Sequence, residues 1–312
     1  MKKKTGGGRF DPDEQTVYFM AGGDYAFANN VKDEWTLIAV NDLMDSDARM
    51  NVLKELVDTP HFKVLLDSGI FNLTNRHMRK NGITMEDALA LDPEAIDGFD
   101  ELFDAYVRIA TEMAPDLWGY IELDQGGATN KRKIRAQLED VGLVPIPVYH
   151  PLNDGWEYFD ELCEQYDRIC LGNVVQASAD TRRHLLSTLW ERRRHHPDVW
   201  IHVLGLTPSE VTTAYPVPSA DSSSWMGAMR YGASSAKAKS MGDAFSGLPE
   251  SYSYNMLAER DDPNGYRKAV AMFSSEARFL QYNMRRQALD VCRVFGDDAL
   301  LPPPDDKENV RR

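Results

Sequence analysis

The chain has 312 residues, which fits either two domains or a single α/β barrel of about 250 residues with extensions. Hydrophobic residues make up 43% of it, enough for a large core, so a disordered protein is excluded. Asp and Glu number 49 against 35 Lys and Arg, and the net charge is −14. That balance argues against a protein that coats nucleic acid by bulk charge, although a local basic groove stays open.

The cysteines and the apolar segments indicate a cytoplasmic protein. Cys163, Cys170 and Cys292 cannot make a disulfide framework and show no C-x-x-C spacing, which favours a reducing compartment. The basic start, Met1 to Lys4, has no apolar segment behind it, so we expect no signal peptide. No apolar run approaches the ~20 residues that a membrane-spanning helix requires, so we expect no membrane partner.

Short apolar segments bounded by Gly, Pro or Asp are the predicted strands. In chain order they are Val17–Ala21, Thr36–Val40, Lys63–Leu66, Trp118–Leu123, Leu143–Tyr149, Arg168–Leu171, Trp200–Leu204 and a weaker segment ending near Ala220. Because these segments are apolar on both sides, they suit strands of a parallel sheet buried on both faces. Pro145 and Pro147 lie inside the fifth strand, and we expect them to distort it because proline donates no ladder hydrogen bond.

Amphipathic segments between these strands predict helices. Phe99–Met113 has one apolar stripe, and Lys131–Asp140 follows Asn130 as a candidate N-cap. Phe159, Leu162 and Tyr166 repeat the helical spacing, as do Leu185, Leu189 and Trp190 in a segment ending at Pro197. The alternation predicts a parallel α/β fold. About eight units without a G-x-G-x-x-G turn favour a (β/α)8 TIM barrel over a dinucleotide-binding sheet.

The C-terminal third departs from this alternation. Met226–Gly265 is rich in Gly, Ser, Ala and Tyr and predicts a long insertion after the late strands. Tyr266–Phe295 is again helical, and the charged, proline-rich residues 301–312 are expected to be a disordered tail. We therefore expect one barrel domain over residues 1–300.

Polar and glycine residues follow the predicted strands, where a barrel has its active site. They are Asp67, Ser68 and Gly69; Glu122, Asp124, Gly126 and Gly127; His150; Gly172 and Asn173; Gly205; and Asp221 with the following serines. Two carboxylates across a pocket can act as nucleophile and general acid/base. Glycines would let a flat ligand approach the backbone.

Each of these residues also has a simple structural interpretation. Asp67 before Ser-Gly is typical of a turn or an N-cap, and Asp221 before three serines is typical of a helix cap. His150 before a proline fits a loop, and the Gly126-Gly127 pair fits a turn. Their succession at strand ends is what favours a shared site.

Taken in order, the motifs resemble those of the tRNA-guanine transglycosylase superfamily. Asp67-Ser68-Gly69-Ile70-Phe71 is similar to its Asp-Ser-Gly-Gly-Phe motif. Leu171-Gly172-Asn173-Val174 resembles the glycine segment that faces the base. The segment His-Val-Leu-Gly-Leu-Thr-Pro-Ser-Glu, from His202 to Glu210, resembles Leu-Met-Gly-Val-Gly-Thr-Pro-Glu-Asp. The similarity covers roughly residues 60–225.

The resemblance implies a role for each motif. Asp221 would be the nucleophile that forms a covalent glycosyl intermediate, and Asp67 would be the general acid/base. Asp124 would accept hydrogen bonds from the guanine edge, and His150 stands where the family has a pocket Gln. The implied substrate pocket is Ser68, Gly69, Phe71, Asp124, His150, Gly172, Asn173 and Gly205.

Three departures from the family pattern point to one of its branches. Ile70 replaces the second glycine, and Ala-Asp-Ser-Ser-Ser-Trp around Asp221 replaces Phe-Asp-Cys-Val-x-Pro-Thr-Arg. The C-terminal zinc module with its clustered cysteines is absent from the sequence. In these departures the chain resembles a divergent branch of the superfamily, which is found in bacterial modification islands and phages. That branch inserts 7-deazaguanines such as preQ0 into DNA.

That branch implies a set of partners. They are DNA and a free 7-deazaguanine base as co-substrate. The sequence has no cluster of residues with zinc spacing, so we expect no metal or cofactor. The enzyme would work in the cytoplasm, the host's if a phage encodes it, and a homodimer stays open. A stacked guanine would have to be flipped or offered single-stranded.

Basic residues of the predicted insertion are the expected nucleic-acid contact. Arg230, Lys237 and Lys239 follow Asp221 closely and lie among tyrosines that could stack on bases. The clusters 131–133, 182–183 and 192–194 are more typical of solvated helix faces.

Four other functions stay open. They are base exchange in transfer RNA, hydrolysis of the glycosyl intermediate, a non-catalytic nucleic-acid-binding subunit, and a metal-dependent barrel hydrolase. The presence of both Asp67 and Asp221 argues against a non-catalytic subunit. The lack of a His-x-His pair after the first strand argues against a metal-dependent hydrolase.

Overall fold

A computed structural model of the chain describes residues 2–12, 17–22, 35–206 and 217–223. Its strands are β1 (Val17–Ala21), β2 (Trp35–Ala39), β3 (Lys63–Asp67), β4 (Gly119–Tyr120), β5 (Val148–Tyr149), β6 (Arg168–Leu171), β7 (Trp200–Val203) and β8 (Ser219–Ser222). They form one eight-stranded sheet in the order β4-β3-β2-β1-β8-β7-β6-β5, and every printed pair is parallel. The predicted parallel α/β fold is confirmed.

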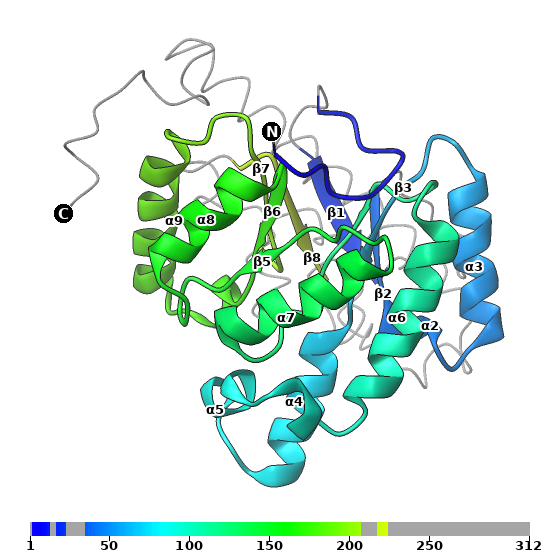
Figure 1. The fold of residues 1–312 in the computed structure, drawn as a ribbon, viewed down its shortest axis with the longest axis horizontal. Helices are drawn as coiled ribbons and strands as arrows, with labels where there is room; N and C mark the ends of the chain where they lie inside the picture. The colour runs from blue at the N-terminus through cyan, green and yellow to red at the C-terminus, as the bar shows by residue number, and fades with distance from the viewer. Residues whose placement is uncertain (1, 13–16, 23–34, 207–216, 224–312) are drawn as a thin grey trace, which may run out of the picture.

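Helices surround this sheet (Figure 1). They are α2 (Val40–Leu43), α3 (Asp47–Asp58), α4 (Ile70–Asn81), α5 (Met85–Ala90), α6 (Phe99–Met113), α7 (Gly127–Asp140), α8 (Trp156–Gln165) and α9 (Ala179–Arg193). Local sequence explains several of their starts: the Ser46 and Ser178 side chains cap α3 and α9, and Thr84 with Asp87 forms a capping box on α5.

Two predicted helix boundaries were wrong. Helix α7 begins four residues before Lys131, after Gly126 as N-cap, so Asn130 is not the cap. Gly126 and Gly127 adopt left-handed φ values of 82° and 71°, which glycine tolerates, and this allows the earlier start. The Asn130 side chain instead donates to Asp92 at 2.7 Å. Helix α9 ends at Arg193, before Pro197.

The first and last strands of this order, β4 and β5, are joined by a short seam in the chain segments next to them. An isolated parallel bridge joins Ile121 to Ile146, and the Ile146 N–H donates to the Tyr120 carbonyl oxygen at 2.8 Å. Pro145 and Pro147 flank Ile146 and lack the N–H groups that a continuous ladder would use, so β5 is shorter than predicted. The sheet is therefore curled and consistent with a TIM-like barrel whose seam has no continuous ladder.

The N-terminal segment packs against the amino ends of the strands. Arg168, the first residue of β6, is fully buried, and its guanidinium donates to the Thr5 and Gly6 carbonyl oxygens at 2.9 and 2.6 Å. The Phe10 ring packs edge-on against Trp118 and Trp200 at 5.1 and 5.4 Å between centroids. In Figure 1 this dark-blue segment runs across the end of the sheet that is far from α4 and α5.

Several expectations lie outside the described residues. They are the insertion Met226–Gly265, the helix Tyr266–Phe295 and the tail 301–312. No helix in the part of the chain that the structure describes is long and apolar enough to cross a membrane.

Candidate active site

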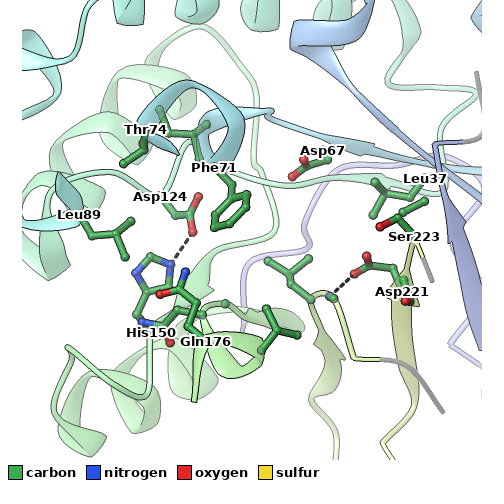
Figure 2. A pocket seen from close by; sticks show the side chains of 18 residues that line it. Leu37, Asp67, Phe71, Thr74, Leu89, Asp124, His150, Gln176, Asp221 and Ser223 are labelled. Atoms are coloured by element: carbon green, nitrogen blue, oxygen red, sulfur yellow. Dashed lines mark hydrogen bonds and ion pairs between the residues drawn. The ribbon is translucent and has the colours of Figure 1, made fainter. Parts of the chain in front are cut away.

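A cavity of about 390 Å³ lies at the carboxyl ends of the strands. Side chains and backbone from six strand ends line it: Asp67, Asp124, His150, Gly172, Gly205 and Asp221. Figure 2 shows the Asp67, Asp124 and Asp221 carboxyl groups around one space, with the Phe71 ring between Asp124 and Asp67. The chain thus brings together residues that lie up to about 150 positions apart in the sequence.

Most predicted pocket residues line the cavity, and two do not. Phe71 and Asn173 join the six strand-end residues in its wall. Ser68 is fully buried, and its hydroxyl accepts the Ile70 N–H at 3.5 Å. Gly69 is the N-cap of α4 with a φ of 80°, so these two residues shape the turn behind Asp67. The predicted contacts Arg230, Lys237 and Lys239 lie outside the described residues.

Asp221 is held by one carboxylate oxygen. It lies within β8 and is 7% exposed, so it does not cap a helix as one interpretation suggested. Its Oδ1 accepts the Gly205 N–H at 2.9 Å and lies 3.2 Å from His202 Nε2. No described residue donates to Oδ2, which leaves that oxygen available to a ligand.

A chain of polar groups on β7 and β8 fixes the His202 ring. The Trp200 indole N–H donates to Ser219 Oγ at 2.8 Å, and that oxygen lies 2.9 Å from His202 Nδ1. Since Ser219 accepts from Trp200, its hydroxyl hydrogen can go to Nδ1. The other ring nitrogen, Nε2, then carries a hydrogen and donates to Asp221. Sequence reasoning quoted His202 only as part of a motif and missed this contact.

Asp124 is paired with His150 across the cavity. Asp124 Oδ2 lies 2.5 Å from His150 Nε2. Burial alone would raise the pKa of Asp124, but the charge and hydrogen bond of His150, together with the Lys131 ammonium, lower it below its usual value. Asp124 therefore carries a negative charge at neutral pH.

Asp67 differs from the other two carboxyl groups. Burial, followed by the negative charges of Asp124 and Asp221, raises its pKa to about 7, and a backbone hydrogen bond from Gly69 only partly opposes this. Neighbouring negative charges disfavour ionisation of a buried carboxyl group, so Asp67 keeps its proton to a higher pH than Asp124 does. It can therefore give and take a proton near neutral pH.

The glycine segment after β6 lies against His150, and one of its side-chain oxygens has no hydrogen-bond partner among the described residues. A Cβ on Gly172 would lie 2.6 Å from His150 Cδ2, so a side chain there would displace the ring. Asn173 adopts a left-handed φ of 50°, and its amide nitrogen donates to Asn153 at 2.6 Å. Asn173 Oδ1 is buried without a partner among the described residues, as expected for a group that accepts from a ligand.

Apolar side chains complete the cavity wall. Phe71 and Val175, which are 46% and 41% exposed, line the cavity together with Leu89. An apolar wall with a few converging polar groups is typical of a small-molecule site. Sequence reasoning missed Val175 and Leu89 because nothing in their local pattern marks them. No group of three His, Cys, Asp or Glu side chains among the described residues could hold a metal ion.

The fold and the site define a parallel α/β protein with a carboxylate-lined cavity at its strand ends. No protein-family model matches the chain, and no curated protein matches it. Among solved structures, one similar chain is described as "Structural study of Project ID from Aquifex aeolicus VF5". It is 11% identical, with a TM-score of 0.41 over 85% of this chain and 94% of that chain.

Proposed function

We propose that the protein is a base-exchange transglycosylase that replaces guanine in DNA with a 7-deazaguanine. The observation that carries the proposal is the meeting of Asp67, Asp124 and Asp221 in one cavity, each in a different electrostatic environment. The proposed reaction is the one that the motif resemblance implies. It requires a nucleophile, an acid/base group and a group that binds the base, and we assign these three roles to residues of the cavity. In this proposal the curled sheet is a (β/α)8 barrel with its active site at the carboxyl ends of the strands.

Asp221 is the proposed nucleophile. Its Oδ2 attacks C1′ of the target nucleotide, so a C1′–Oδ2 bond forms while the C1′–N9 bond breaks. The two contacts on Oδ1 orient the carboxylate, and Oδ2 is the oxygen to which no described residue donates. In the second step, N9 of the incoming base attacks C1′ and releases Asp221.

Asp67 is the proposed proton carrier. It gives its proton to the departing guanine and takes one from the incoming base, so protons balance over the cycle. A pKa near 7 suits both steps, because an acid/base group is most effective when its pKa lies near the working pH.

Asp124 and its neighbours are the proposed base reader. The ionised Asp124 accepts from the N1–H and amino group of guanine, and the low pKa that His150 and Lys131 give it against burial keeps it an acceptor at neutral pH. Asn173 Oδ1 is a further acceptor, and Phe71 offers an aromatic face to the purine.

Labelled guanine tests the proposal directly. The protein is incubated with labelled guanine and either DNA or transfer RNA, and label in the polymer is counted. We expect label in DNA, its release by 7-deazaguanine, and at least about a thousandfold loss in Asp221→Asn, because an amide is a poor nucleophile. Asp140→Asn, an exposed change on α7, should keep full activity.

Other outcomes identify the competing functions. Label in transfer RNA alone would mean that the choice of polymer is wrong. Abasic sites without label would indicate hydrolysis. Full exchange by Asp221→Asn would overturn the nucleophile assignment, and no reaction with either polymer would favour a non-catalytic subunit.

A further inference from the structure

Helix α4 is basic in an acidic chain. Its 12 residues include Arg76, His77, Arg79 and Lys80 but no Asp or Glu, whereas the whole chain carries a net charge of −14. Arg76, Arg79 and Lys80 are exposed. We call Arg76, His77, Arg79 and Lys80 the α4 basic face.

This face continues from the cavity. The first turn of α4 contributes Ile70, Phe71 and Thr74 to the cavity wall. At about 1.5 Å per residue, Arg76 and Lys80 lie roughly 8 and 14 Å further along the helix axis than Phe71. A polymer whose reacting unit occupies the cavity would therefore have its neighbouring units beside α4.

Two arginines of α4 differ in their partners from four basic residues of the other clusters. Lys131 pairs with Asp154, Arg132 with Glu161, Arg183 with Asp180 and Arg192 with Asp160. Arg76 and Arg79 form no ion pair with any described residue. Lys133, Arg182 and Arg194 of those clusters also lack a carboxylate partner among the described residues, but α7 and α9 do not line the cavity, whereas α4 does.

The α4 basic face borders a hollow of about 340 Å³. Arg76, His77 and Lys80 line it together with Asp97 and Gly98. Asp97 accepts from Lys80 at 2.5 Å, and that hydrogen bond and charge hold the pKa of Asp97 below its usual value. Among the residues that line the hollow, one carboxylate is set against two cations and an imidazole, and the Glu101 carboxylate lies beside Gly98 at its edge.

We infer that the α4 basic face binds the phosphates of the DNA strand next to the exchanged nucleotide. The inference rests on the proposed function, since it takes DNA as the polymer whose guanine enters the cavity. A chain of net charge −14 repels DNA over most of its surface, so productive docking requires local cations near the cavity. Arginine and lysine contacts to phosphate release counterions and position the strand without reading its sequence.

The test compares two triple variants that remove equal charge. One is Arg76→Ala/Arg79→Ala/Lys80→Ala, and the control is Arg132→Ala/Lys133→Ala/Arg183→Ala on α7 and α9. Binding of a guanine-containing single-stranded oligodeoxynucleotide is titrated at several salt concentrations. We expect the α4 variant to bind at least about tenfold more weakly near 0.1 M salt, with a salt slope shallower by about 2, and the control to change much less.

The remaining measurements separate this inference from the proposed function. Both variants should bind free 7-deazaguanine like the wild type, and saturating DNA should restore the exchange rate of the α4 variant. Equal weakening in both variants, or unchanged affinity in the α4 variant, would overturn the inference while wild-type exchange still stood. Binding of transfer RNA but not DNA at this face would overturn it too. Wild-type protein that binds DNA through α4 without exchanging guanine would overturn only the proposed function.

Discussion

At the scale of single residues, the cavity contains three aspartate carboxyl groups, and each has different hydrogen-bond partners. Asp124 has an imidazole at 2.5 Å, Asp221 has an imidazole and a backbone N–H on one oxygen, and Asp67 has only the backbone of its own turn. Between Asp67 and Asp124 the surroundings shift the pKa of the same side chain in opposite directions. Such differences allow carboxyl groups in one site to take different catalytic roles.

The pKa of Asp67 can be tested by removing a neighbouring charge. We expect its carboxyl ¹³C resonance to titrate near pH 7 in the wild type. In Asp221→Asn the midpoint should fall, because one of the negative charges that oppose ionisation of Asp67 is gone. Asp42→Asn, which removes the weakest of these charges, should move it less. An unchanged midpoint in Asp221→Asn would mean that the two groups do not interact.

The same shift predicts a pH dependence of stability. Between the usual value of 3.8 and about 7, folded Asp67 keeps a proton that the unfolded chain has lost. Its contribution to the free energy of unfolding is therefore complete below pH 3.8 and decreases as the pH rises towards 7, by at most about 1.4 kcal/mol per pH unit. Urea unfolding at a series of pH values should show a shallower decline in Asp67→Asn.

At the scale of elements, two neighbouring strands carry the contact that orients Asp221. His202 of β7 is paired in register with Ser219 of β8, and Asp221 follows two residues later on the same side of that strand. The register thus places the imidazole between the serine and the carboxylate. Shifting it by one residue would turn Asp221 out of the cavity.

Substitution of His202 tests this arrangement. We expect His202→Phe to lower kcat for guanine exchange by about 10–100-fold with little change in KM, because Asp221 would lose orientation rather than substrate contact. His202→Gln, whose amide can donate to Asp221, should recover part of the rate. If Phe and Gln were equally impaired while both folded normally, hydrogen bonding by His202 would not be its contribution.

Much at this scale could be predicted from sequence, because short apolar segments indicate strand positions directly. The strands β1 and β6 were predicted with their observed bounds. Of the residues expected after strands, one cavity is lined by Asp67, Asp124, His150, Gly172, Asn173, Gly205 and Asp221, but not by Ser68, Gly69, Glu122, Gly126 or Gly127. The partners of His202 and the exposure of Val175 could not be predicted, because they depend on which strands become neighbours. The start of α7 was missed because Gly126 and Gly127 favour a turn in a sequence pattern, yet here they lead into a helix.

At the scale of the whole molecule, the N-terminal segment and a buried arginine close one end of the sheet. Removing residues 2–9 would take away the Thr5 and Gly6 acceptors of Arg168 and leave a charge buried with fewer partners. We expect a loss of roughly 3–5 kcal/mol in the free energy of unfolding, measured in urea. Adding Arg168→Met to the truncated chain should recover part of that loss. No recovery would mean that the segment stabilises the fold by packing alone.

That closed end has a consequence for the timing of the proposed reaction. With the amino ends of the strands packed by the N-terminal segment, the cavity at their carboxyl ends serves both for arrival and for departure. The cavity offers one set of groups to which the proposal assigns contact with the base, Asp124, Asn173 and Phe71, so it has one base position. The outgoing guanine must then vacate its place before its replacement can enter. Every cycle would include an interval in which the sugar is attached to Asp221 and the base position is empty, and during that interval free guanine and 7-deazaguanine compete for the same position.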